Sequence, residues 1–324
     1  MIWDDLGGLF ELSRLHNSMF PSPSQQTSHP TPGTFLLRNL SPRSLFPPDV
    51  TQPQDNMAAP RKEEGRALEP GAAPYGNFPH YSRFHPPEGR LSLLPGGLLR
   101  RLFPSDHRPL LGLDVGCNSG ELSVALYRHL LGLQEGKGSP EQPADRRDLH
   151  LLCCDIDPVL IERAQQSSPF PNSISFANLD IMDSNTREPF LSSYLSRFGR
   201  STFDISFCMS VTMWIHLNHG DRGLVEFLAF LSSLCRYLLI EPQPWKCYRA
   251  AARRLRKLGR NDFDHFRSLA IKGDMAERIT QILTRDCTME LVCCFGNTSW
   301  DRSLLLFKSN GLNHEGGETS EQQQ

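Results

Sequence analysis

The sequence predicts an α/β fold: a Rossmann-like sheet of seven strands whose last two form a C-terminal antiparallel hairpin. Apolar segments alternate with helix-like segments between residues 110 and 260, which is typical of a parallel sheet covered by helices. The first apolar segment leads directly into a glycine-rich bend. Near the end of the chain, two further apolar segments are joined by a short polar turn, which is typical of a hairpin.

The chain is expected to begin with an extension, 1–73, that does not fold. Residues 21–60 are rich in Pro, Ser, Thr and Gln and have few periodic apolar positions, a composition typical of disorder. Met57-Ala-Ala-Pro60 followed by charged residues looks like an ordinary protein start, so we hypothesise that residues 1–56 are absent from the native protein. The polar residues 311–324 are predicted to form a loose tail.

Residues 74–91 interleave aromatic, His and Arg side chains with prolines. This segment is too aromatic for a linker, and we predict an ordered arm that lies over a cleft. Tyr81, Arg83 and Arg90 would then supply contacts to a ligand, while the aromatic rings pack. A strap that only packs against the core is the alternative interpretation.

The first strand ends in the bend Asp114-Val-Gly116-Cys-Asn118-Ser-Gly120. The strand is apolar on both faces, which favours a central position in a parallel sheet. Glycine lets the backbone pass close to a ligand, and the helix start behind it offers free N–H groups. The bend therefore predicts a corner that holds a nucleotide-like cofactor, although a plain βα turn without a ligand fits the same residues.

The charge at this bend indicates which cofactor it holds. A dinucleotide fold uses G-x-G-x-x-G to place a pyrophosphate on the helix N-terminus. Here Asn118 replaces the middle glycine and Asp114 precedes the bend. A carboxylate at that position repels a pyrophosphate but can hold an α-ammonium group. These residues favour S-adenosylmethionine over NAD.

Asp155 ends the second strand, where a carboxylate can accept hydrogen bonds from two ribose hydroxyls. It follows the glycine bend at a greater separation than usual, and we attribute the excess to an inserted surface loop at 132–147. Asp157 is followed by Pro158, so a helix N-cap is a credible alternative role for this second acid.

The third strand leads to Asp180 and Ile181. In this fold class Asp180 can accept a hydrogen bond from an adenine amino group, with Ile181 against the ring. A loop carboxylate with no ligand explains Asp180 equally well.

The fourth strand, 203–209, ends in Cys208 and Met209. Ligands of open α/β sheets bind beyond the carboxyl ends of the strands, so we expect this end to face the transferred methyl group. The polar and aromatic residues that follow are candidates for the substrate mouth, although a lone histidine is more often structural. They are Trp214, His216, Asn218 and His219.

One strongly basic segment follows the fifth strand. Between residues 246 and 260 it holds seven Lys or Arg residues and no acid. Their spacing of three and four places many of them on one face of a helix, and Gly259 is a plausible C-cap. We favour a track for RNA phosphates over a solvated helix face.

The composition narrows the class of protein. The net charge of −2 gives no bulk signature of a nucleic-acid binder, so RNA contact requires a local patch. No apolar run reaches membrane-spanning length. The nine cysteines lie mostly in apolar segments without C-x-x-C spacing, so we expect free thiols in a reducing compartment, no disulfide framework and no metal.

Four segments together resemble the bicoid-interacting-protein-type RNA 5′-end methyltransferases. They are Gly76-Asn-Phe78 with Tyr81 and Arg90, the bend 114–120, Cys208 to Asn218, and Glu241-Pro-Gln-Pro-Trp245. The resemblance covers about residues 58–310 and is closest to the branch that acts on RNA 5′-monophosphates. It implies a class I S-adenosylmethionine-dependent methyltransferase fold over 74–310 and a cytoplasmic enzyme. It also implies small structured RNAs as substrates, with histidine tRNA and microRNA precursors as candidates.

The resemblance, added to the reading of the individual motifs, gives the expected site. The cofactor would contact Arg90, Gly116, Asn118, Asp155, Asp180, Ile181, Cys208 and Met209. By motif match, the phosphate would face the catalytic residues Tyr81, Arg83 and Lys246. The RNA would contact His216, Asn218, Arg249, Arg253, Arg254, Arg256 and Lys257. The oligomeric state stays open, with a monomer as the working expectation.

The chemistry of such a site needs no general base. A phosphate monoester is already anionic at neutral pH because its second pKa is about 6. The enzyme has to align the two reactants and exclude water. A strong cationic clamp would quench the nucleophile, so we expect one or two positive groups with hydroxyl or amide donors. A methyltransferase for a small molecule or protein, and a binding module without catalysis, are the alternatives.

Overall fold

The computed structural model describes residues 74–104, 108–133 and 148–311, all of which belong to one compact unit. The predicted extension 1–73, nearly all of the predicted loop 132–147 and the tail after residue 311 lie outside the described residues.

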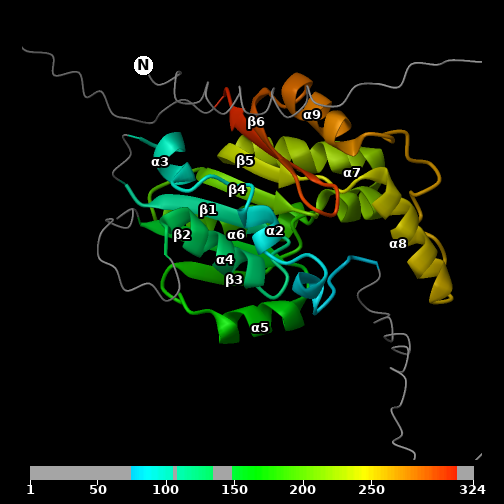
Figure 1. The fold of residues 1–324 in the computed structure, drawn as a ribbon, viewed down its shortest axis with the longest axis horizontal. Helices are drawn as coiled ribbons and strands as arrows, with labels where there is room; N and C mark the ends of the chain where they lie inside the picture. The colour runs from blue at the N-terminus through cyan, green and yellow to red at the C-terminus, as the bar shows by residue number, and fades with distance from the viewer. Residues whose placement is uncertain (1–73, 105–107, 134–147, 312–324) are drawn as a thin grey trace, which may run out of the picture. The chain divides into compact units, whose positions relative to one another are not determined.

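A seven-stranded sheet in the order β3-β2-β1-β4-β5-β7-β6 organises the described part of the chain (Figure 1). Strands β1 to β5 pair in parallel, whereas β7 is antiparallel to both β5 and β6. The predicted fold class is therefore confirmed, including the closing hairpin. The strands are β1 Leu110–Val115, β2 Leu149–Asp155, β3 Ile174–Asn178, β4 Phe203–Met209, β5 Cys235–Glu241, β6 Met289–Asn297 and β7 Ser303–Ser309.

Two layers of helices cover this sheet and explain why its central strands are apolar on both faces. One buried cluster joins the sheet to α3, α4 and α5, and the other joins it to α6, α7, α8 and α9. Strands β1 and β4 are buried at every position, which agrees with the central position predicted for the first strand. The helices are α2 Glu88–Leu91, α3 Leu98–Leu102, α4 Glu121–Leu131, α5 Pro158–Ser167, α6 Ser184–Ser196, α7 Thr212–Leu234, α8 Trp245–Lys257 and α9 Met275–Arg285, with a 3₁₀ turn η1 at Tyr81–Arg83.

The register brings the carboxyl ends of the central strands to one edge of the sheet. Val115 of β1 lies opposite Cys154 of β2 and Cys208 of β4, and Met209 lies opposite Glu241 of β5. The loops that leave these strands therefore start side by side. The same edge carries the N-terminal arm and α8 (Figure 1).

Helix α7 begins soon after β4 ends. Apolar residues with helical spacing start only at about Gly223 in the sequence, but residues from Thr212 onward are already helical. Gly220 interrupts the helix with φ 71° and ψ −174°, a conformation that suits glycine, so the first turns form a separate helical piece.

Candidate active site

A cavity of about 260 Å³ opens at the carboxyl edge of the sheet. The loops after β1, β2, β3 and β4 form its floor, and the N-terminal arm forms part of its wall. This is where an open α/β sheet binds its ligand. The lining residues are Tyr75, Gly76, Asn77, Tyr81, Val115, Gly116, Asn118, Cys154, Asp155, Ile156, Leu179, Asp180, Ile181, Met182, Met209, Ser210, Val211, Trp214, Ile215, Asn218 and His219.

The glycine bend is a tight turn in which three residues adopt the left-handed backbone conformation. Gly116, Asn118 and Gly120 have φ of 75°, 51° and 78°. A Cβ at Gly116 would lie 2.4 Å from Val211 Cγ2, so only glycine fits there without a shift. Asn118 donates its backbone N–H to Asp155 Oδ2 at 2.9 Å. This hydrogen bond joins the bend to the acid that ends β2.

Asp155 and Asp157 have different environments. Asp155 is 8% exposed, and Asp157 donates its backbone N–H to Asp155 Oδ1 at 3.0 Å. Burial raises the pKa of the Asp155 carboxyl. Asp157 caps α5, because its Oδ1 accepts hydrogen bonds from the backbone N–H groups of Val159 and Leu160. The N-cap interpretation of Asp157 is thus confirmed, while Asp155 faces the cavity.

The residues after β3 and β4 divide between the cavity wall and the core. Asp180 and Ile181 both line the cavity, and Asp180 Oδ1 accepts a hydrogen bond from the Met182 backbone N–H. Met209 lines it from the end of β4. Cys208 is fully buried and is not among the described residues that line the cavity.

A second, smaller cavity of about 40 Å³ adjoins the first. Tyr81, Gly116, Asn118 and Met209 line both. The smaller one is also lined by the buried Asp114 and Arg90, which are 2% and 1% exposed, and by the exposed Glu121.

The charged groups of Asp114 and Arg90 are almost completely shielded from solvent. Asp114 accepts a hydrogen bond from Ser123 Oγ at 2.6 Å, and burial raises the pKa of its carboxyl to about 6. An acid and a base that line one small cavity are complementary to the ammonium and carboxylate of an amino acid. The residues therefore fit the methionine end of S-adenosylmethionine, and the apolar residues and acids of the larger cavity fit its nucleoside.

The N-terminal arm is tied to the cavity by side chains of the core. Asn118 donates from Nδ2 to the Phe78 carbonyl at 3.1 Å, and Asn77 donates to Asp157 Oδ2 at 2.6 Å. Asn218 donates to the Pro74 carbonyl at 2.9 Å. These contacts agree with the predicted arm over a cleft, and they show Asn218 holding the arm as well as lining the cavity.

A buried charged cluster lies behind Tyr81. Arg90 donates from Nε and Nη2 to Glu241 Oε2 at 3.0 and 2.8 Å. Arg302 donates from Nη1 to Tyr81 Oη at 2.9 Å and to Ser210 Oγ at 2.5 Å. Ser210 in turn donates to Glu241. The Ser210 hydroxyl is thus hydrogen-bonded to both guanidinium groups and to the carboxylate of Glu241.

Two aromatic side chains close this cluster. Trp300 donates from Nε1 to Glu241 Oε1 at 3.0 Å, and the guanidinium of Arg90 lies 5.0 Å from the centre of a Trp300 ring. His85 Nε2 lies 3.4 Å from Arg302 Nη2. Burial and the two arginines lower the pKa of His85 to about 4, so this ring is neutral at pH 7.

The sequence did not identify Arg302 as a site residue. It precedes the apolar strand β7, and a basic residue at a strand end is usually exposed. In the structure Arg302 is 7% exposed and its Nε has no hydrogen-bond partner among the described residues. The antiparallel pairing of β7 with β5 carries Arg302 to the edge where Glu241 ends β5.

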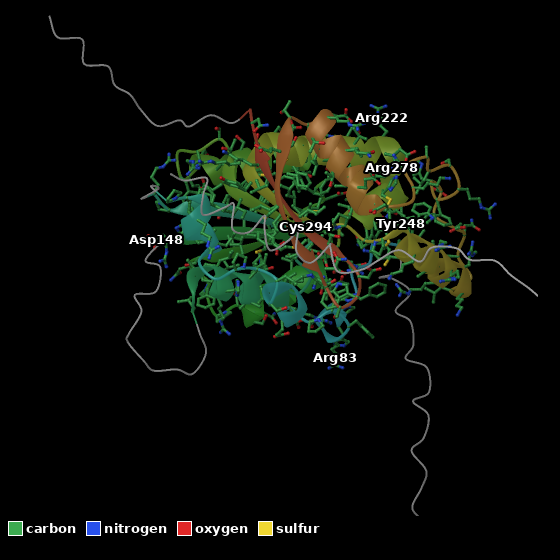
Figure 2. All side chains as sticks on the ribbon, turned by 45° about the horizontal axis from the view of Figure 1, so that its top comes forward. Arg83, Asp148, Arg222, Tyr248, Arg278 and Cys294 are labelled. Atoms are coloured by element: carbon green, nitrogen blue, oxygen red, sulfur yellow. The ribbon has the colours of Figure 1, made fainter. Side chains whose placement is uncertain are left out.

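Two of the residues predicted to face the phosphate lie outside both cavities as far as the described residues show. Arg83 is exposed, and Figure 2 shows its side chain on the outer side of the arm, pointing away from the ribbon. Lys246 is exposed and pairs with Asp301 at 2.7 Å. Their catalytic roles stay predictions.

His216 is fully buried in α7. Its Nε2 lies 2.7 Å from Asp221 Oδ1, and its Nδ1 lies 3.1 Å from Tyr248 Oη. Asp221 also accepts a hydrogen bond from the Ala270 backbone N–H. His216 therefore joins α7 to α8 and to the segment before α9. It is not among the described residues that line a cavity, and its RNA contact stays a prediction.

Helix α8 has the predicted basic face. Tyr248, Ala251, Ala252 and Leu255 are buried, whereas the basic side chains lie mostly on the opposite side. Arg254 differs, because its guanidinium lies 4.7 Å from the centre of the Phe78 ring and so contacts the arm. The exposed basic residues are Lys246, Arg249, Arg253, Arg256 and Lys257.

The described residues contain neither a candidate metal cluster nor a membrane-spanning helix. No group of three or more His, Cys, Asp or Glu residues in the described ranges is placed to hold a metal ion. Among the same residues, no helix is both long and apolar enough to cross a lipid bilayer.

The sheet order with an antiparallel β7, the glycine bend, and the buried Asp114 and Arg90 beside it define a class I, S-adenosylmethionine-dependent methyltransferase. Among solved structures, the chain is similar to the N-methyltransferase NodS from Bradyrhizobium japonicum WM9 in complex with S-adenosyl-l-homocysteine. The TM-score is 0.43 and the identity 20%, over 74% of this chain and 96% of that one.

Sequence comparison identifies the family. The family model of bicoid-interacting protein 3 (Bin3) matches residues 203–309. The chain is 72% identical over 250 residues to the RNA 5′-monophosphate methyltransferase of Bos taurus, covering 76% of this chain and 85% of that protein. It is 63% identical over 247 residues to the pre-miRNA 5′-monophosphate methyltransferase of Xenopus laevis, covering 74% and 94%. The chain therefore belongs to the Bin3 family, among the RNA 5′-monophosphate methyltransferases, as the motif resemblance predicted.

Proposed function

We propose that this protein transfers a methyl group from S-adenosylmethionine to the 5′-monophosphate of small structured RNAs. The observation that carries the proposal is the position of Tyr81. Tyr81 lines the small cavity together with Asp114 and Arg90, and its hydroxyl is hydrogen-bonded to the buried Arg302. Tyr81 therefore lies between the small cavity, which fits the methionine end of the cofactor, and the buried arginines, which suit a phosphate.

The cofactor would be held by residues of four loops. Asp114 and Arg90 are complementary to its ammonium and carboxylate. Each Asp155 oxygen accepts one backbone N–H and keeps a second lone pair for a ribose hydroxyl. Asp180 and Ile181 are placed for the adenine. When bound, S-adenosylmethionine supplies an electrophilic methyl group on a sulfonium.

The phosphate would be held by Tyr81 with Arg302 behind it. Among the described residues no acceptor takes the proton of the Tyr81 hydroxyl, which is therefore free to donate to a phosphate oxygen. Arg302 polarises this hydroxyl from 2.9 Å without lining the cavity itself. Because the phosphate is already anionic, these residues only have to align it and exclude water.

The rest of the RNA would follow the exposed face of α8. Arg249, Arg253 and Lys257 have no acidic partner among the described residues, and Arg254 connects the helix to the arm at Phe78. A row of cations on a helix that contacts the arm suits an RNA backbone. We therefore keep the RNA-contact role for these residues, and Arg256 adds to the row although it pairs with Asp262.

The remaining details of the proposal come from the resemblance and from the relatives' names. Relatives from Xenopus laevis and Danio rerio are named for pre-miRNA, which favours microRNA precursors, and histidine tRNA remains a candidate. All nine cysteines are free thiols, which agrees with a reducing compartment such as the cytoplasm. We expect the enzyme to act as a monomer.

The test compares methyl transfer to one hairpin RNA with a 5′-hydroxyl, a 5′-monophosphate or a 5′-triphosphate end. We expect the monophosphate RNA to be labelled at least about tenfold faster than the other two, because each polar group at the site then has its partner. Equal labelling of all three RNAs would contradict the proposal. Labelling of none, with calorimetry showing cofactor binding, would favour the non-catalytic binding module.

A further inference from the structure

Glu241 is the residue on which the charged cluster converges. It is fully buried at the end of β5. Oε2 accepts Arg90 and the Ser210 hydroxyl, Oε1 accepts Trp300 Nε1 at 3.0 Å, and Arg302 Nη1 lies 4.0 Å from Oε2. Glu241 does not line either described cavity, so it acts on a ligand only through its neighbours.

The titratable groups around Tyr81 give a simple charge count. Arg90 and Arg302 contribute two positive charges and Glu241 one negative charge, while His85 is neutral at pH 7. Asp114, which lines the small cavity, contributes a second negative charge. Bound S-adenosylmethionine would add an ammonium and a sulfonium, both positive, and one carboxylate. The site with its cofactor would therefore have a net charge of +1 although it holds two guanidinium groups.

This count matters because a 5′-monophosphate carries about 1.5 to 2 negative charges at neutral pH. Two uncompensated guanidinium groups would neutralise it and make its oxygen a poorer nucleophile. With one charge compensated, the bound phosphate keeps electron density for attack. A 5′-triphosphate carries more negative charge, so the carboxylate repels it more strongly than it repels a monophosphate.

We propose that Glu241 is a positioning residue that holds the phosphate subsite at a single net positive charge, which keeps the bound 5′-monophosphate nucleophilic and disfavours a 5′-triphosphate. This inference rests on the proposed function. It adds a residue that touches neither reactant but sets both the rate and the end-group preference.

The first variant is Glu241→Gln, which removes the charge and keeps the size of the side chain. Measured at saturating cofactor with 5′-monophosphate RNA, KM should fall about threefold and kcat about tenfold, because binding strengthens while the nucleophile weakens. The triphosphate-to-monophosphate ratio is the dissociation constant of triphosphate RNA divided by that of monophosphate RNA. It should fall about fivefold, because triphosphate RNA gains more affinity when the negative charge is removed.

The matched control is Trp300→Phe. Glutamine has one oxygen, so Glu241→Gln also loses the hydrogen bond to Trp300, and Trp300→Phe loses that bond alone. The control should leave the triphosphate-to-monophosphate ratio unchanged within about twofold. A merely structural role for Glu241 would raise KM, lower kcat and leave this ratio unchanged in both variants, and that result would overturn the inference.

A second pair of variants tests the inference if thermal unfolding shows that the Glu241→Gln protein does not fold. Arg302→Gln removes one positive charge and should raise the triphosphate-to-monophosphate ratio of dissociation constants. Arg302→Lys keeps the charge and should leave this ratio unchanged. Equal ratios for these two variants would overturn the inference. Failure of the proposed function is distinguishable, because the wild-type enzyme would then not prefer the 5′-monophosphate in methyl transfer.

Discussion

Asp114 is a buried acid whose environment disfavours its charge. In the folded protein burial raises its pKa to about 6, whereas an aspartate in an unfolded chain has a pKa of about 3.9. The folded state therefore binds this proton more tightly than the unfolded state does. The contribution of Asp114 to stability is present below about pH 4 and is lost as the pH rises through about 6. At neutral pH the carboxylate destabilises the protein until a cation is bound.

We predict that Asp114→Asn stabilises the cofactor-free protein at pH 7.5 by about 2 kcal/mol, since one pKa unit corresponds to about 1.4 kcal/mol. This gain should shrink as the pH is lowered toward 4.5. The same variant should bind S-adenosylmethionine at least about tenfold more weakly, because the ammonium loses its counter-charge. Urea unfolding at the two pH values and calorimetry measure these effects.

The exposed Asp148, at the start of β2, is the matched control (Figure 2). Asp148→Asn should change neither the cofactor affinity nor the stability by more than about 0.5 kcal/mol. An Asp114→Asn protein that is less stable than the wild type at pH 7.5 and binds the cofactor normally would contradict the prediction.

Individual site residues were predictable where a short motif carried them. Asn118 and Asp155 were predicted because a bend and an acid lie at the ends of predicted strands, and the structure shows both lining the cavity and joined by a hydrogen bond. Arg302 was not, because only the pairing of β7 with β5 brings it to Tyr81, some 220 residues away in the chain. No local pattern encodes such a contact.

Among the elements, α8 follows most directly from its sequence. Its apolar residues recur with helical spacing and are buried, and its basic residues take the other face. Helix α9 also follows from local sequence features, namely an N-cap residue and apolar residues with helical spacing. Asp274 accepts a hydrogen bond from the Glu277 backbone N–H, and Ile279 and Leu283 are buried one turn apart. These two features would have allowed α9 to be predicted from the sequence.

We predict that neutralising α8 by Arg249→Gln, Arg253→Gln and Lys257→Gln together weakens binding of 5′-monophosphate RNA about 10- to 100-fold at low salt. The slope of log Kd against log salt should fall by about 2, as expected when about three phosphate contacts are lost. Cofactor affinity should not change, because these side chains do not line the described cavities. Fluorescence anisotropy over a salt series measures the effect.

The control removes the same number of charges elsewhere on the surface, through Arg101→Gln, Arg163→Gln and Arg222→Gln on α3, α5 and α7, where all three side chains are exposed. If this triple variant lost as much affinity and salt dependence as the α8 variant, RNA binding would follow from net charge and the α8 track would be wrong.

At the scale of the whole described molecule, the arm joins the cofactor cavity to the basic helix. Phe78 illustrates this. Its carbonyl accepts from Asn118 of the glycine bend, and its ring contacts both Trp214 and the guanidinium of Arg254 on α8. A Cβ at Gly76 would lie 2.0 Å from a Trp214 ring atom, so the arm approaches the cavity wall as closely as a glycine allows. Filling the cavity should therefore affect the arm and, through it, α8.

We predict that S-adenosylhomocysteine slows amide hydrogen exchange in residues 74–85 by at least about tenfold, because it fills the cavity on which the arm rests. Exchange in the edge strand β6 should not change. Phe78→Ala should weaken cofactor binding several-fold and remove most of this protection, whereas Phe190→Ala, at an exposed position of α6, should do neither. Normal cofactor binding without any change of exchange in 74–85 would mean that the arm only packs against the core. That alternative makes the arm a fixed strap, and it would leave α8 energetically independent of the cofactor.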